Sequence, residues 1–99
     1  MQFFHDKESL AHHISQLGGE IARTRQLYLR LIRLLPARYG SLLMEHRSRY
    51  DAGKARRIAY MDERYLAYVD EINSLSFRLH KLRIEWETQL LLNRCPRRP

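Results

Sequence analysis

The fold is decided by residues 58–86, IAYMDERYLAYVDEINSLSFRLHKLRIEW, in which apolar side chains recur at alternating spacings of three and four. A second run of the same kind occupies residues 10–35. This spacing places the apolar side chains of each run on one face of an α-helix, and such a face is stable only when another surface covers it. The sequence therefore predicts an all-α protein built around two long helices.

The two runs match best when they are paired antiparallel. In the favoured register the two residue numbers of each layer sum to 96, so the stacked pairs include Leu10 with Trp86, Tyr28 with Tyr68, Leu31 with Tyr65 and Leu35 with Met61. This register also sets His13 beside Glu85, whereas a shift by one heptad sets Glu20 against another glutamate. We therefore expect an antiparallel coiled-coil hairpin of residues 6–35 with residues 54–93.

A segment of 22 residues, 36–57, connects the two expected helices. Pro36 is predicted to end the first helix, because a residue that precedes proline is pushed away from helical angles. Gly40 and Ser41 indicate a turn and a new N-cap, which would open a short helix over residues 41–50. Asp51 is a plausible N-cap for the long helix. Three helices then make one domain over residues 1–99, with an N-terminal arm (1–5) and an extended basic tail (94–99).

Composition excludes several classes of protein. The chain is 44% hydrophobic and 29% charged, which is typical of a folded helical protein and too apolar for a disordered one. No apolar run reaches the length of a membrane span, and the first residues do not resemble a secretory signal. Cys95 is the single cysteine, so no internal disulfide is expected. These features favour a cytoplasmic protein.

The excess positive charge is concentrated in the connecting segment. The whole chain carries a net charge of +7, and residues 36–57 hold six basic and two acidic side chains. The candidate binding residues of this basic head are Arg38, Arg47, Arg49, Lys54, Arg56 and Arg57. Such residues neutralise nucleic-acid phosphates or contact an acidic protein surface, and they also occur in connectors that only face solvent. No sequence-specific DNA- or RNA-binding motif is present.

A second candidate surface lies on the far side of the long helix, where Phe77, Ile84 and Leu91 are spaced by seven residues. Together with Leu90, these residues face away from the first helix in the expected register. They predict contact with a protein partner or with a second copy of the chain. The alternative is that the short middle helix, or Phe3 and Phe4, fold over them.

No group of residues indicates catalysis, a cofactor or a metal site. His12 and His13 are adjacent and point about 100° apart on a helix, so they are poorly placed to share a metal ion. There is no glycine-rich phosphate loop, nucleophile elbow or pair of catalytic carboxylates. An enzyme that binds an anionic metabolite among arginines is the remaining catalytic class, and no pattern here supports it. We expect no enzymatic activity.

These features predict a small, basic, oligomeric coiled-coil accessory protein. Such an adaptor would dock a protein partner or itself through the apolar face, and would contact nucleic acid or an acidic surface through the basic head. The alternative is a purely protein-binding module, such as an assembly chaperone, an inhibitor or a structural spacer. No small-molecule substrate is expected.

Overall fold

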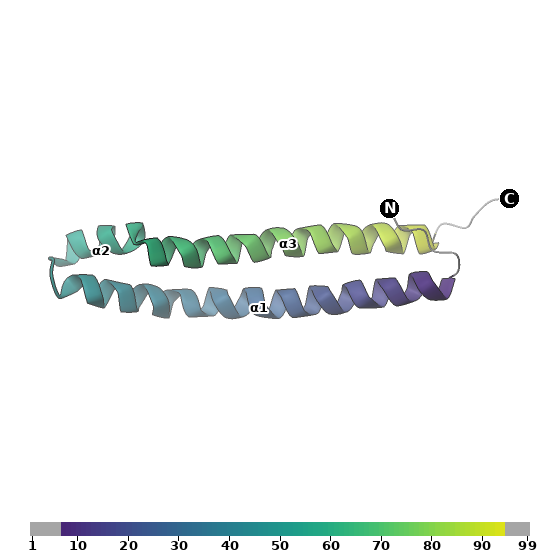
Figure 1. Cartoon of the computed structure of the whole chain (residues 1–99), viewed down its shortest axis with the longest axis horizontal. Helices are drawn as coiled ribbons and strands as arrows, with labels where there is room; N and C mark the ends of the chain where they lie inside the picture. Colours follow the sequence, from purple (N-terminus) through teal and green to yellow (C-terminus); the bar gives the residue numbers. More distant parts are fainter. Residues whose placement is uncertain (1–6, 95–99) are drawn as a thin grey trace.

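A computed structural model describes residues 7–94 and contains three α-helices (Figure 1). They are α1 (Lys7–Arg47), α2 (Ala52–Met61) and α3 (Glu63–Arg94), and the described part of the chain has no strand. The prediction of an all-α protein with three helices is confirmed. The expected N-terminal arm and the tail after Arg94 lie outside the described residues.

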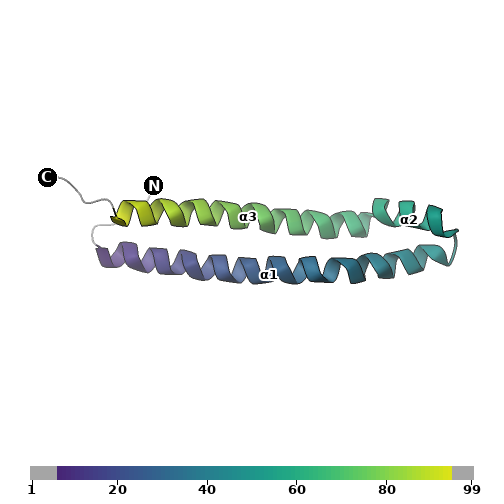
Figure 2. The same cartoon turned by 180° about the vertical axis from the view of Figure 1, so that it is seen from behind.

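The three helices form one thin rod. Helix α1 occupies one side, the chain reverses at residues 48–51, and α2 and α3 return beside it, as both views show (Figures 1 and 2). The rod measures 73 × 17 × 16 Å, the thickness of two helices. Its core is a single seam, whose buried side chains are Leu17, Thr24, Leu31, Leu42, Ala55, Ala59 and Leu79.

The first helix does not end at Pro36, so that prediction is wrong. Helix α1 continues through Pro36 to Arg47. The proline removes one backbone donor to the carbonyl of Ile32 and costs about 3 kcal/mol inside a helix. Pro36 is exposed, whereas Leu31 and Leu42 on either side are buried in the seam. Each buried leucine contributes about 1.5–3 kcal/mol, so packing on both sides outweighs the local cost.

The separate short helix over residues 41–50 does not exist either. Residues 41–47 belong to α1, Gly40 lies inside this helix, and a turn occupies residues 48–50. Leu42 therefore packs in the seam, while Met44 points outward and is 75% exposed. The connecting segment 36–57 is consequently divided between the end of α1, the turn and the start of α2, and it forms no independent head.

Asp51 is an N-cap, as expected, but it caps α2. Its carboxylate accepts a hydrogen bond of 2.9 Å from the backbone N–H of Lys54. The long helix predicted over residues 54–93 is broken at Asp62, where the backbone is extended (φ −62°, ψ 131°). Asp62 then starts α3, because its carboxylate accepts a 2.8 Å hydrogen bond from the backbone N–H of Arg64.

The expected sum-96 register is wrong over most of the rod. The Tyr65 ring packs against Tyr39 and not Leu31, with ring centroids 5.7 Å apart. The guanidinium of Arg38 lies 4.4 Å from the centre of the Tyr68 ring. The reason is the longer α1, which moves the turn and hence the facing residues.

Three further observations show where the expected register fails and where one of its pairs is present. The indole nitrogen of Trp86 lies beside Gly18, 3.8 Å from where a Cβ would be, although Leu10 was its expected partner. Met61, expected to stack on Leu35, is 76% exposed. The expected pair of His13 with Glu85 is present, at 3.5 Å.

Candidate interaction surfaces

Five of the six predicted basic residues lie around the turn that joins α1 to α2. They are Arg47 at the end of α1, Arg49 in the turn, and Lys54, Arg56 and Arg57 in α2, and all five are exposed. We call this group the basic turn. Within residues 7–94, none of the five forms an ion pair. Their charges are therefore available to an anionic partner.

Arg38 does not belong to the basic turn. It lies on α1 about 14 Å before Arg47 at 1.5 Å per residue, and it is half-buried with its guanidinium over the Tyr68 ring. This contact is a cation–π interaction that joins α1 to α3. The prediction that Arg38 acts together with the other five residues is corrected, because the helix continues through Pro36 and carries Arg38 away from the turn.

A polar network at the α2–α3 break was missed by the sequence analysis. Asp62 accepts hydrogen bonds from the Arg64 side chain at 2.9 and 3.1 Å and contacts the His46 ring nitrogen at 2.8 Å. The Arg64 guanidinium also bonds Glu45 on α1 at 2.9 Å. The break is thus tied to the end of α1. The sequence did contain a signal for this break. Asp62 is a residue type that often caps a helix, and the acidic Glu63 follows it in the first turn of α3.

This network shifts the acid–base properties of both of its central residues. Hydrogen bonds from Arg64 and then His46 hold the pKa of the Asp62 carboxyl well below its usual range. The same carboxyl, followed by Glu45, raises the pKa of Arg64 further. Both groups therefore stay charged across the physiological pH range.

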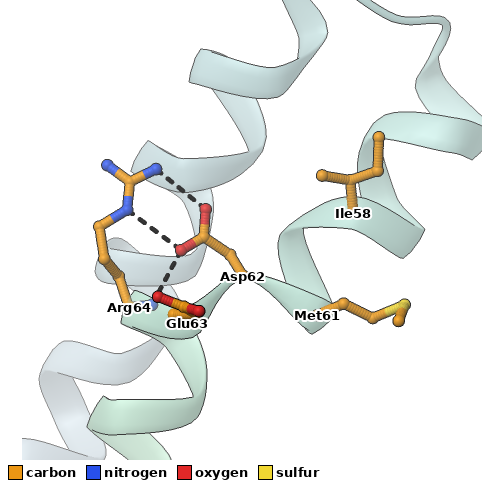
Figure 3. A pocket seen from close by; sticks show the side chains of 5 residues that line it. All are labelled: Ile58, Met61, Asp62, Glu63 and Arg64. Carbon is orange, nitrogen blue, oxygen red and sulfur yellow. Dashed lines mark hydrogen bonds and ion pairs between the residues drawn. The ribbon is translucent and has the colours of Figure 1, made fainter.

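An open depression lies beside this break. Figure 3 shows Ile58 and Met61 of α2 on one side and the Arg64 side chain folded back onto Asp62 on the other. Because Asp62 and Arg64 neutralise one another, the depression offers an incoming ligand only the Glu63 carboxylate as a free charge. We attribute the depression to the loss of helical packing at the break.

Three tyrosines hold α1, α2 and α3 together near the same break. The rings of Tyr39 and Tyr60 stack at 4.6 Å, and Tyr65 meets both rings edge-on at 5.7 and 5.4 Å. Burial of the Tyr39 phenol and its hydrogen bond with Tyr60 raise the pKa of Tyr39. A phenol that is harder to ionise does not serve as a base near neutral pH, so this cluster is a packing feature.

The predicted apolar residues of α3 are largely uncovered. Phe77 is 65%, Ile84 52% and Leu91 62% exposed, and their seven-residue spacing aligns them on one face of α3. We call these three residues the outer row. Leu90 is half-buried and therefore lies beside the row and not within it. The alternative that a short middle helix covers the row is excluded, because residues 41–47 are part of α1; Phe3 and Phe4 lie outside the described residues.

The histidines do not gather with other ligands. No group of three or more His, Cys, Asp or Glu side chains within residues 7–94 has the geometry to hold a metal ion. None of the described helices has an apolar stretch sufficient to cross a bilayer.

The chain was compared with known protein families, curated proteins and solved structures, and it matches none of them. Any functional assignment therefore depends on the surfaces described above.

Proposed function

We propose that this protein is a non-enzymatic, oligomeric coiled-coil adaptor of the cytoplasm. In this proposal the antiparallel helical hairpin is a rigid spacer, the basic turn contacts nucleic acid, and the outer row docks a protein. The observation that supports it is the presence of two unlike, unsatisfied surfaces on one rod. One is a group of five unpaired cations, and the other is a row of apolar side chains that are more than half exposed.

The basic turn suits the nucleic-acid backbone better than a base-reading role. Its cations project from a turn and from the first two turns of α2, so no helix presents a row of side chains for a groove. Contacts of this kind bind phosphates without regard to sequence, and they release counterions. If all five cations contact duplex phosphates, affinity falls by about 500-fold between about 50 and 200 mM salt.

The test is a salt series of fluorescence anisotropy titrations with random-sequence DNA and RNA. Arg56→Glu together with Arg57→Glu is expected to abolish binding at low salt and to leave the helical circular dichroism unchanged. The matched control is Arg30→Glu with Arg33→Glu, which removes the same charge from exposed positions in the middle of α1. Equal losses in both variants would show that overall charge, and not the basic turn, causes binding.

A second candidate is a module that binds proteins only, such as an assembly chaperone, an inhibitor or a structural spacer. The outer row favours it, because this apolar face is suited to a protein and not to a phosphate backbone. Absence of DNA and RNA binding by the wild-type protein at about 50 mM salt would remove the adaptor function in favour of this one.

A further inference from the structure

We propose that the outer row binds a second copy of this chain, antiparallel, with the two Ile84 side chains meeting at a two-fold axis. This inference rests on the proposed function, because it names the partner of the apolar face. It makes the protein a dimer joined through the second half of α3. The two basic turns then lie at opposite ends of the assembly.

The first argument is the position of the outer row relative to the seam. Leu79 is fully buried and Trp86 half-buried against α1. Phe77 and Ile84 each precede one of these residues by two positions. Two residues correspond to a rotation of about 200° around the helix, so Phe77 and Ile84 lie on the side of α3 that faces away from α1. Helix α1 therefore leaves this face entirely free.

The second argument is that the outer row is complementary to itself. With Ile84 on the axis, Ile84 packs on Ile84, and Phe77 packs on Leu91 of the second copy. Every side chain of the row therefore finds an apolar partner: the Phe77–Leu91 contact forms twice, and the Ile84–Ile84 contact forms once on the axis. A shallow depression lies on one flank of the row, between Phe77, Ile84 and Leu82, and Arg78, Lys81 and Glu85 also line it.

The third argument is charge. On antiparallel helices each flank of a contact meets the same flank of the other helix. Lys81 lies on one flank of the row with Glu85, and His80 lies on the other with Glu87. The axis at Ile84 brings Lys81 to Glu85 and His80 to Glu87 of the second copy, so each opposite pair forms twice. All four of these residues are exposed. Within the chain, Glu85 also pairs with His13 on α1 at 3.5 Å, and the Lys81 ammonium lies 5.5 Å from the centre of the Phe77 ring.

The neighbouring registers lack this match. Moving the contact by one step of the row, so that Phe77 meets Ile84, brings Lys81 against Lys81 of the second copy. Moving it the other way, so that Ile84 meets Leu91, brings Glu87 against Glu87. Like charges that face one another disfavour a pairing. The charges thus select the register that also pairs all three apolar residues.

The resulting dimer also separates its basic ends. Residue 84 is about 48 Å from the start of α2 at 1.5 Å per residue, so the two basic turns are about 100 Å apart. This distance greatly exceeds the Debye length of about 8 Å at physiological salt, so their repulsion is screened. A parallel dimer would place both basic turns side by side. The antiparallel dimer is therefore the favoured form, and it would present two binding ends that face away from each other.

The test begins with sedimentation equilibrium of the full chain over a wide concentration range. Wild type is expected to be a dimer, and Ile84→Glu is expected to weaken it at least 100-fold, because two carboxylates would face each other at the axis. The matched control is Leu66→Glu. Leu66 is exposed on the same helix, at 49%, but its counterpart in the proposed register would lie beyond Arg94, where α3 ends. This control should dimerise as wild type does.

Charge reversal tests the register while all three apolar residues of the outer row are kept. Lys81→Glu should weaken the dimer about 10-fold, and the double variant Lys81→Glu with Glu85→Lys should recover it, because the reversed pairs attract again. A double variant that is weaker than the single one would overturn the register.

The orientation is measured by spin labels on Asn73→Cys in a Cys95→Ser background. The antiparallel dimer predicts a separation of about 33 Å along the axis, whereas a parallel dimer predicts about 10 Å. A monomeric wild type, or a short distance between the labels, would overturn the inference. Nucleic-acid binding by a monomer would leave the proposed role of the basic turn standing without the dimer, and a dimer that binds no nucleic acid would leave the interface standing without that role.

Discussion

Pro36 provides the most direct test of the architecture, because the length of α1 depends on it. Within a continuous helix, Pro36→Ala restores one hydrogen bond to the carbonyl of Ile32 and relieves the clash of the ring with the preceding turn. The proline side chain is exposed, so its removal opens no cavity in the seam. The substitution is therefore expected to stabilise the protein.

The size of the gain follows from two opposing effects. Alanine is favoured over proline in a helix interior by about 3 kcal/mol. Loss of the proline also gives the unfolded chain more freedom, which offsets about 1 kcal/mol. A net gain of about 2 kcal/mol corresponds to an increase in Tm of roughly 10 °C for a domain of this size.

The assay is thermal unfolding followed by circular dichroism at one fixed protein concentration, because oligomerisation makes Tm depend on concentration. The control is Pro36→Gly, which restores the same hydrogen bond but is less favourable than alanine by about 1 kcal/mol. The expected order of stability is alanine, then glycine, then proline. If both variants unfold at or below the wild-type temperature, α1 is not continuous at this position and the hairpin turns earlier.

Two other predictions concern the seam and the α2–α3 break. Leu42→Ala should destabilise the protein by about 2–4 kcal/mol in urea unfolding, because Leu42 is only 4% exposed. The control Met44→Ala, at a position that is 75% exposed, should have little effect. Similar losses of stability in both variants would place residues 41–47 outside α1. The pKa of Asp62 is depressed in the folded state, so its contribution to stability is complete above the unfolded value of about 3.9 and is lost as the pH falls below it. The stability of Asp62→Asn should therefore change less than that of wild type between about pH 4 and 2.

The candidate surfaces were predictable to different degrees. Phe77, Ile84 and Leu91 were identified from their spacing alone, and they are exposed because seven residues are close to two helical turns wherever the helix begins. Five of the six basic residues were correctly grouped because they are neighbours in the sequence. Arg38 lies apart from them, because the first helix was expected to end at Pro36 and instead continues to Arg47.

By itself the sequence determined that this protein is helical, that each long helix carries an apolar stripe, and that the second long helix carries a further apolar row. Those properties depend on spacing within a single helix, which local geometry sets. Only the tertiary structure decided where α1 ends, where α3 begins and which residues face each other. Pro36 and Asp62 show the reason. The local cost of the proline is outweighed by leucines buried on both sides of it. The break at Asp62 becomes stable when Arg64 and His46 bond its carboxylate. Both effects require residues that are far apart in the chain or are brought together only by packing.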